Sequence, residues 1–387
     1  MNNVLPKFQR PIQGIDEPRA EVANWDKAMD AYDAKNFRTA VIETINYINP
    51  GILAGKNTQE HITIVRGQGS AEIHVSITDS TFTVKAPFLR ATDATNKVAL
   101  YRKIAEVNFN PLTLSQINLK DDTLWFEYEM PIALCQPYKV YDVLREICVY
   151  ADDYDDEFVE KYKADFYKEA SVQPLAGSEV ETVWQQIQDI LNDYKNYSAF
   201  FKEKRWDVFQ WDITLISILK IVNMPYVHGT LRTKLQEYVN NMMNNGINFQ
   251  LRVDKGTNFM QKLCAKSKED FMKDIYHADV FISLKWRSSI QILQEDAKHL
   301  ENTVNRYVND GDNFSLCYFL QYNFLYILYN FNVEEVHKNA IYDVLEKVSG
   351  LEPPAAAPKL LDTYYSLLNG STKAASGSKG LFAKLFG

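Results

Sequence analysis

The chain has 387 residues, of which 46% are hydrophobic, so it is long enough for two or three domains and apolar enough to fill their cores. Its formal net charge of −8 argues against non-specific nucleic-acid binding, because such binding requires a basic surface. The four cysteines are widely spaced and form no CxxC pair, which favours buried, reduced thiols: Cys135, Cys148, Cys264 and Cys317.

The N-terminal sequence MNNVLPKFQRP lacks the apolar run of a secretory signal. The most apolar stretch, Cys317–Phe331, is too short to span a bilayer and contains amide side chains, so we expect a buried helix there. Together these features predict a cytoplasmic protein. Residues 1–20 contain Pro6, Pro11 and Pro18, which predict an extended N-terminal arm.

Residues 21–170 show helical and strand periodicities in a segregated order. A helix pair comes first and ends at Pro50 and Gly51. Three strands, a helix, two strands and a long helix follow, at 61–66, 71–77, 81–88, 96–107, 112–119, 123–130 and about 138–168. This order predicts an α+β domain with an antiparallel five-stranded sheet packed by helices.

The remainder of the chain is predicted to be mostly helical. A linker at 171–178 precedes an all-α domain of six to eight helices at 179–350. Residues 351–387 form a Pro/Ala/Gly/Ser-rich linker with a short apolar and basic C-terminal tail. Within it, Pro353–Pro358 is expected to be a stiff spacer and Lys359–Leu368 a short helix.

No catalytic motif is visible in the sequence. The phosphate-binding loops, the GxSxG elbow and the HExxH zinc motif are all absent, so we expect no catalytic, cofactor or metal-binding residues. His61 and His74 could face each other across a hairpin, but without nearby cysteine ligands they are better interpreted as surface strand residues.

The richest charge cluster is the acidic run that contains Asp152, Asp153, Asp155 and Asp156. Three interpretations remain open. The carboxylates could share one helix face and hold Mg²⁺, they could form a solvated face, or they could recognise a basic partner. The solvated face is favoured, because no second carboxylate motif completes a metal site. The four aspartates remain the candidate acidic partner-binding face.

The C-terminal tail combines lysines with four apolar side chains that would share one face of a helix: Leu381, Phe382, Leu385 and Phe386. A segment this short does not hold a helix in water alone. We favour docking in a partner's groove. Docking on the chain itself, peripheral membrane contact and the absence of any docking are the alternatives.

The run from about Ile62 to Lys163 resembles the YbjN family of bacterial proteins, which share the fold of type III secretion chaperones. The resemblance is carried by the segment KVALYRKIAEVNFNPLTLSQINLKDDTLWFEYEMPI and then by VLREICVYADDYDDEF. Its closest feature is the acidic end of the long helix at Ala151–Phe158, ADDYDDEF. The helical half carries no such resemblance.

This resemblance implies a small acidic domain without ATPase activity that holds an extended segment of a partner. We therefore predict a non-enzymatic chaperone or adaptor in the bacterial cytoplasm. It would recognise a protein partner through the sheet face of the α+β domain and the apolar tail, and a homodimer is one option. Nucleic acid is not expected as a partner. The alternatives are a scaffold subunit of a larger assembly and, as a distant third, an enzyme of unknown class.

Overall fold

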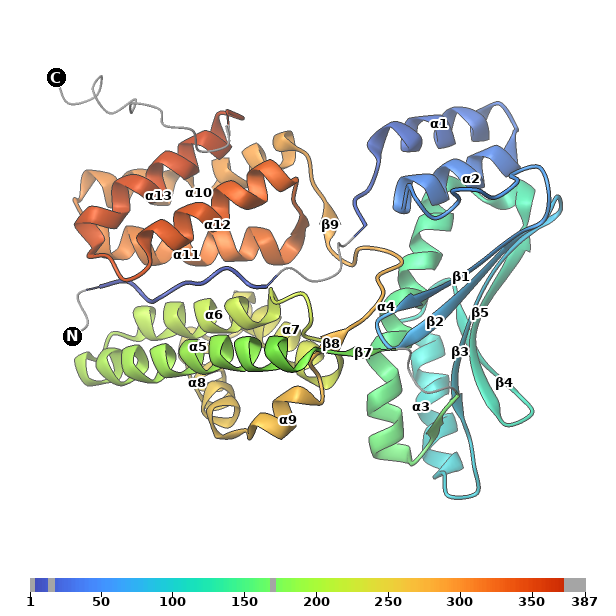
Figure 1. The fold of residues 1–387 in the computed structure, drawn as a ribbon, viewed down its shortest axis with the longest axis horizontal. Helices are drawn as coiled ribbons and strands as arrows, with labels where there is room; N and C mark the ends of the chain where they lie inside the picture. The colour runs from blue at the N-terminus through green and yellow to red at the C-terminus, as the bar shows by residue number, and fades with distance from the viewer. Residues whose placement is uncertain (1–3, 13–17, 168–171, 372–387) are drawn as a thin grey trace.

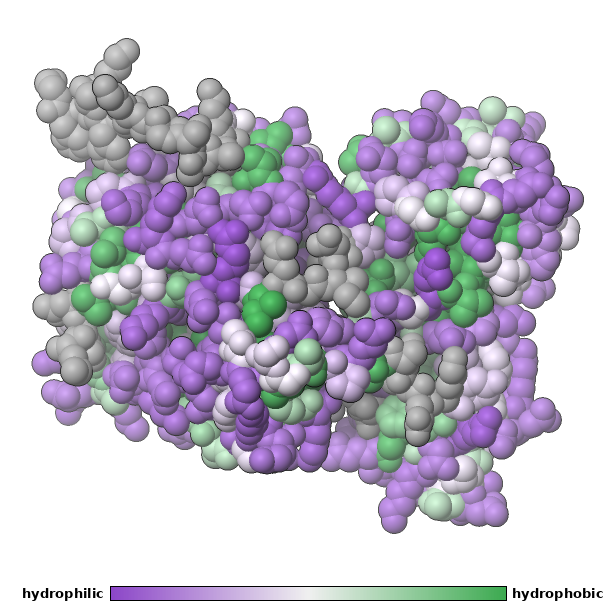
Figure 2. Space-filling model, viewed as in Figure 1, coloured by the Kyte–Doolittle hydropathy of each residue, from purple (hydrophilic) through white to green (hydrophobic). Residues whose placement is uncertain are grey.

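The computed structural model describes residues 4–12, 18–167 and 172–371, except for the side chains of Asp153 and Asp156. Figure 1 shows two halves side by side, an α+β half and a helical half. Each half has its own hydrophobic core. Most of the visible surface is polar, while apolar side chains gather on the α+β half below its first two helices (Figure 2).

The α+β half contains one antiparallel sheet with the strand order β1-β2-β3-β5-β4, and β6 pairs with β3. This architecture confirms the prediction of an antiparallel sheet packed by helices. The elements of this half are α1 (Val22–Asp33), α2 (Phe37–Ile48), β1 (Ile62–Gln68), β2 (Ala71–Ile77), β3 (Thr81–Arg90), α3 (Lys97–Phe109), β4 (Gln116–Lys120), β5 (Thr123–Pro131), α4 (Pro137–Tyr162) and β6 (Asp165–Phe166).

Alternating side chains hold this sheet against its helices. Ile62 and Ile64 of β1 point to the core, as do Ile73 and Val75 of β2, while the residues between them are more exposed. A two-residue period of this kind produces one buried and one open face. Figure 1 shows α3 and α4 against one face of the sheet, and the apolar stripe of α4, which includes Leu144, is fully buried.

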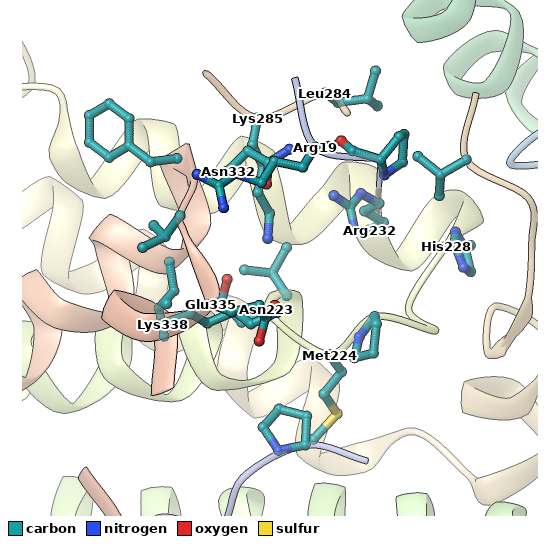
Figure 3. A pocket seen from close by; sticks show the side chains of 18 of the residues that line it. Arg19, Asn223, Met224, His228, Arg232, Leu284, Lys285, Asn332, Glu335 and Lys338 are labelled. Atoms are coloured by element: carbon teal, nitrogen blue, oxygen red, sulfur yellow. Dashed lines mark hydrogen bonds and ion pairs between the residues drawn. The ribbon is translucent and has the colours of Figure 1, made fainter. Parts of the chain in front are cut away.

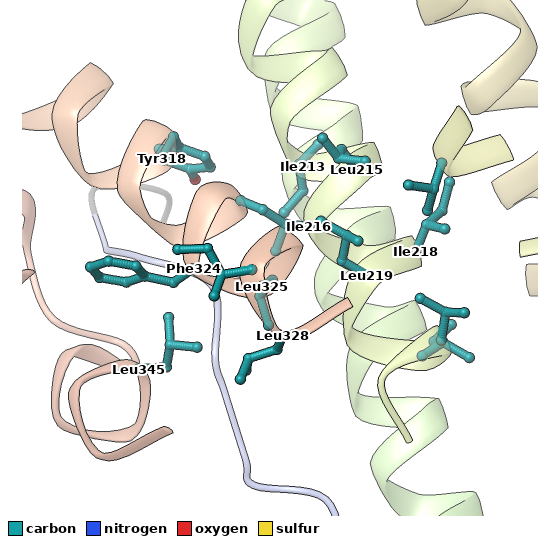
Figure 4. Close-up of a cluster of buried hydrophobic side chains, with 14 of the residues drawn as sticks. Ile213, Leu215, Ile216, Ile218, Leu219, Tyr318, Phe324, Leu325, Leu328 and Leu345 are labelled. Carbon is teal, nitrogen blue, oxygen red and sulfur yellow. The ribbon is translucent and has the colours of Figure 1, made fainter. Parts of the chain in front are cut away.

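The helical half is built around α6 and α11, as Figure 4 shows. Every residue of α6 from Gln210 to Val222 is buried, which is typical of a helix surrounded by others. The elements of this half are β7 (Gln173–Pro174), α5 (Gly177–Lys204), α6 (Asp207–Val222), α7 (Gly229–Met243), α8 (Phe249–Ala265), α9 (Lys268–Met272), β8 (Tyr276–His277), β9 (Trp286–Arg287), α10 (Ile290–Asn309), α11 (Asn313–Asn330), β10 (Phe331–Asn332), α12 (Glu335–Val348) and α13 (Pro353–Leu368).

The expected spacer at Pro353–Pro358 is instead the start of α13. Proline is tolerated in the first turn of a helix, because the backbone N–H groups there have no helical partner. Pro353, Ala356 and Leu360 are buried in the helical core. The composition that is typical of a stiff linker therefore belongs to a packed helix.

Residues 4–12 of the expected N-terminal segment 1–20, which we call the arm, are extended and lie inside the helical half. Figure 1 shows the arm between the layer of α5 and α6 and the layer of α11 and α12. Leu5 is 0% exposed and belongs to the helical core. The predicted linker at 171–178 likewise has structure at its end, because β7 pairs with β8 and α5 begins at Gly177.

A second extended segment belongs to the second half of the chain but packs against the α+β half. Residues 278–285, which we call the strap, connect β8 to β9 and lie against the α+β half. Phe281 and Ile282 are 1% and 2% exposed and belong to the α+β core. Gln68 Oε1 accepts hydrogen bonds from the backbone N–H groups of both, at 2.9 and 3.0 Å. The α+β core is therefore completed by residues from the second half of the chain.

Candidate ligand-binding cavity between the two halves

A cavity of about 720 Å³ lies where the two halves meet, and we call it the interdomain cavity. Its walls come from the arm, the β1–β2 turn, α4, the α6–α7 connection, the strap and the ends of α11 and α12. The lining includes Arg10, Pro11, Ile12, Pro18, Arg19, Asn49, Gln68, Asp152, Asn223, Met224, His228, Arg232, Leu284, Lys285, Asn332, Glu335, Lys338 and Tyr342. Cavities of this size commonly accept small molecules.

The described lining is rich in positive charge although the whole chain is acidic. It contains five cationic side chains, Arg10, Arg19, Arg232, Lys285 and Lys338, against two carboxylates. Figure 3 shows Arg19, Lys285 and Asn332 on one side of the space and Asn223, Glu335 and Lys338 on the other. A cationic concavity of this kind attracts anions, because low-dielectric walls focus the field.

Three of these cations already have carboxylate partners. Arg10 Nη2 lies 2.5 Å from Asp343 Oδ1, and Arg19 Nη2 lies 2.5 Å from Glu334 Oε1. Lys338 forms an ion pair with Glu335. These three side chains therefore contribute less positive charge to the cavity than their number indicates.

Arg232 differs from them. Its Nη1 donates to the carbonyl oxygen of Val227 at 3.3 Å, and within the described residues the guanidinium forms no ion pair. A guanidinium presents several N–H donors in a planar array that fits carboxylate and phosphate groups. Arg232 thus keeps N–H donors that could bind an anion.

Two buried polar atoms of the lining residues lack hydrogen bonds to the described part of the chain. Asn223 donates from Nδ2 to the carbonyl oxygen of Leu325 at 2.9 Å, but its buried Oδ1 accepts nothing. The buried Nε2 of His228 is also without a partner. Buried polar groups are normally satisfied, so such atoms are typical of a position that a ligand or water completes.

His228 is neutral in this environment. Burial, together with the charges of Arg232 and His277, lowers its pKa to about 3. Its ring stacks on Tyr276 with centroids 4.7 Å apart. At neutral pH it can therefore exchange one hydrogen bond with a ligand, but it does not add positive charge.

The acidic run predicted as a partner-binding face is only partly described. Asp152 Oδ1 accepts hydrogen bonds from Ser70 N at 2.7 Å and Ser70 Oγ at 2.9 Å, and Ser70 Oγ also donates to Asp155. Asp155 is only 4% exposed. These two carboxylates bind the β1–β2 turn and do not form a solvated face.

The turn itself depends on this contact. Gly69 adopts a positive φ of 58°, and a Cβ added there would lie 1.9 Å from Asp152 Oδ1. Only glycine allows the carboxylate to approach so closely. Asp152 also lines the interdomain cavity, so one predicted site residue does reach it. The side chains of Asp153 and Asp156 lie outside the described residues.

The predicted tail residues Leu381, Phe382, Leu385 and Phe386 lie outside the described residues. On the open face of the sheet, Glu127 forms ion pairs with Lys120 at 2.5 Å and Lys85 at 3.6 Å. Burial would raise the pKa of Glu127, but hydrogen bonds from Lys120 and Asn118 lower it overall. This part of the sheet face is polar.

The described residues contain no group of three or more His, Cys, Asp and Glu side chains that could hold a metal ion. His61 and His74 make separate contacts, to Ser76 and Glu72. Within the same described ranges, no helix is both long enough and apolar enough to cross a membrane.

Sequence reasoning missed the cationic residues of the cavity. Arg10 and Arg19 lie in the proline-rich segment 1–20. Arg232 and Lys285 lie far away in the second half of the chain, and no motif connects them with the first two. The only signal was the position of Arg10 and Arg19 beside prolines in a segment that was expected to be extended. Comparisons with protein-family models, curated proteins and solved structures find no match to this chain.

Proposed function

We propose that the protein is a non-enzymatic binding protein of the bacterial cytoplasm that holds a small anionic molecule in the interdomain cavity. The observation that carries this proposal is Arg232, which lines the cavity and whose guanidinium has no described counter-ion. A ligand with a phosphate or carboxylate group would meet Arg232.

The non-enzymatic part of the proposal is supported by the state of the titratable groups. His228 is held neutral with a pKa of about 3, so it is a poor general base at neutral pH. Glu335 is paired with Lys338, and Asp152 accepts hydrogen bonds from Ser70. These contacts favour binding over proton transfer.

A thermal-shift titration tests this function. The probes are inorganic phosphate, a sugar monophosphate and citrate, each against the full chain. At least one of them should raise the Tm by several degrees, because a ligand that binds only the folded state stabilises it. Arg232→Gln should abolish the shift.

The matched control is Arg306→Gln. Arg306 lies over the ring of Tyr307 at 4.8 Å, outside the cavity lining, so this variant should respond as the unchanged chain does. If no probe shifts the Tm, or if Arg232→Gln shifts as much as the control, the anion-binding proposal is wrong.

A protein-binding adaptor is the second candidate, and the outer face of α3 favours it. Val98, Tyr101 and Phe109 are 65%, 37% and 88% exposed and lie three and then eight positions apart, on one face of the helix. Exposed apolar residues that share a face are typical of an interaction surface. The strap already fills a site for an extended segment in the α+β half, so that site is not open to a partner. The exposed face of α3 is therefore the better place for a partner to bind.

The double variant Val98→Ser with Phe109→Ser tests the adaptor. It should lose a stoichiometric partner in affinity purification while its Tm stays unchanged, whereas Val308→Ser should keep the partner. A folded partner at fixed stoichiometry would favour the scaffold-subunit alternative, and unfolded clients would favour a chaperone. Equal recovery from all variants would remove α3 from consideration.

A further inference from the structure

The main chain of the arm is bound by side chains of α5 and α6. The hydroxyl of Tyr197 donates to the carbonyl oxygen of Val4 at 2.8 Å. Lys220 Nζ donates to the carbonyl oxygen of Lys7 at 2.6 Å, and Gln186 Nε2 donates to that of Arg10 at 3.1 Å. Three carbonyl groups along one extended segment are therefore satisfied by the same helical layer.

The N–H groups of the arm are bound mainly from the opposite layer. Phe8 N donates to Ser349 Oγ at 2.9 Å, and Arg10 N donates to Glu346 Oε1 at 3.2 Å. Two further N–H groups are also paired, Leu5 N with the carbonyl oxygen of Leu351 at 2.8 Å and Lys7 N with Asp193 Oδ2 at 2.7 Å. We call the space between these layers the arm groove.

Side chains add specificity to these main-chain contacts. Leu5 is fully buried, and the ring of Phe8 stacks on Tyr342 with centroids 6.1 Å apart. Arg10 lies over the same tyrosine ring, 5.2 Å from its centroid, and forms an ion pair with Asp343. The groove thus selects an extended segment with an apolar residue, an aromatic residue and an arginine in this order.

The groove is polar where it faces the arm. Burial lowers the pKa of Lys220 to about 8, although the negative charge of nearby Asp193 partly opposes this shift. A second cavity, of about 220 Å³, lies under the arm and is lined by Lys220, Asp193 and Gln186. Without an extended main chain, the buried side chains of Lys220 and Gln186 would lose hydrogen-bond partners at a free-energy cost. The groove therefore has the chemistry of a peptide-binding site that the chain fills itself.

We propose that the arm groove is a binding site for an extended peptide, and that the arm of a second copy of this chain can occupy it to form an arm-exchanged dimer. All hydrogen bonds of the described arm residues go to the helical half, so the groove cannot distinguish its own arm from an identical one. Exchange of an identical segment between copies is a common route to dimers. The tethered arm has the higher effective concentration and therefore normally occupies the groove of its own chain. Exchange should need the arms of two copies to be released together, as in refolding.

The first experiment tests the groove as a binding site. A chain that lacks residues 1–12 is titrated with a synthetic peptide of residues 2–12, and the Tm and far-UV circular dichroism are recorded. The peptide should bind one to one and raise the Tm, or restore the fold if the shortened chain is unfolded. A peptide with Leu5→Asp should bind at least about tenfold more weakly, because it would bury a charge.

A second variant keeps the chain complete. Leu5→Ala weakens the arm in place, so the labelled peptide should compete with it, whereas it should bind the unchanged chain far more weakly. A shortened chain that gains neither fold nor stability from a large excess of peptide would overturn the proposal. Equal binding of the intact and Leu5→Asp peptides would do the same.

The second experiment tests whether the arm of a second copy occupies the groove. Affinity-tagged chain lacking residues 1–12 is refolded together with untagged full-length chain, and the captured complex is weighed by light scattering. A dimer should form, and it should not form when the untagged chain carries Leu5→Asp. Capture of both chains alike, or peptide binding without capture of either, would overturn the exchanged dimer.

Discussion

The arm (residues 4–12) and the strap (278–285) are both extended segments, yet different chemistry holds them. The strap buries Phe281 and Ile282 in the α+β core, and its backbone is bound by the amides of Gln68 and Asn49 and by the guanidinium of Arg145. The arm buries Leu5 completely, and its backbone contacts include a buried lysine, Lys220, and carboxylates. Only the arm site therefore combines a buried lysine with carboxylates.

The stability of the two halves should therefore respond to different perturbations. Apolar burial is insensitive to pH, so the strap site should respond to side-chain truncation alone. The helical half also buries titratable groups, including Asp212 and Lys220, each 6% exposed, and His228, which is 7% exposed. Its stability should therefore change with pH through the differences between folded and unfolded pKa values.

The largest effect should come from the strap. Phe281→Ala removes a fully buried ring and is expected to lower the free energy of unfolding by about 3–5 kcal/mol. Hydrogen exchange should rise first in β1, β2 and α2. Phe249→Ala is the matched control, because Phe249 is 36% exposed, and it should change stability little. A mild effect at Phe281 would mean that the α+β core does not need the strap.

Truncation of the arm should have the next largest effect, in the other half. Leu5→Ala is expected to lower the free energy of unfolding by about 2–4 kcal/mol, measured by urea denaturation. Faster exchange should appear in α5, α6 and α12, while β1 and β2 stay protected. Leu251→Ala, at a position that is 45% exposed, serves as the control. Exchange that rises first in the sheet would contradict the comparison.

Asp212 should make the stability of the helical half depend on pH. It forms no hydrogen bond or ion pair with the described residues, and burial raises its pKa to about 8. The folded state keeps this proton between about pH 4 and pH 8 while the unfolded state loses it, so stability falls as the pH rises through this window. Asp212→Asn should raise the stability at pH 7 by up to about 4 kcal/mol and flatten its pH dependence. An unchanged pH profile would show that Asp212 is ionised in the folded state.

His228 should act in the acidic range with a smaller effect. Its folded pKa of about 3 lies below the unfolded value, so the unfolded state takes up a proton first as the pH falls below about 6.5. Stability should therefore decrease from pH 7 to pH 5 by about 1–2 kcal/mol from this group. His228→Phe should remove this part of the decrease, and His61→Phe should not. The difference between the two variants can be measured by urea denaturation at each pH.

The C-terminal tail provides a third apolar segment for the comparison, and its removal should have the smallest effect on stability. Deletion of Lys379–Gly387 is expected to leave the Tm nearly unchanged and to weaken association with a natural partner at least several-fold, because the free energy of burying the apolar side chains and the entropic cost of ordering the tail nearly cancel. Phe382→Ala with Phe386→Ala should reproduce most of the loss. A loss of several kcal/mol on deletion would instead indicate docking on the chain itself.

Local patterns predicted those parts of the fold that depend on near neighbours. The alternation in residues 61–66 and 71–77 predicts the first hairpin, which the structure has as β1 and β2, and the helical spacing of Val140, Leu144 and Ile147 puts all three on the buried side of α4. In each case the period of the element decides which side chains are buried. Such information is present within a window of a few residues.

The arm, the strap and the cavity depend on contacts that no local window contains. Prolines showed that the arm is extended, but its partner Ser349 lies 341 positions away. Pro353 was interpreted by composition as part of a spacer, although its burial among helices places it in α13. Arg232 lines the cavity together with Asn223 and His228 only because the fold brings the distant segments of its walls together. Each of these features is set by tertiary packing, which overrides local propensity.

The order in which these contacts become available also has a consequence for biosynthesis. Chains are made from the N-terminal side, so the arm emerges well before its partners: Ser349 lies 341 positions after Phe8. The α+β half must likewise wait for Phe281, which is 213 positions after Gln68. Each half therefore remains incomplete until these distant partners are made, and its apolar surface stays exposed to cellular chaperones in the meantime.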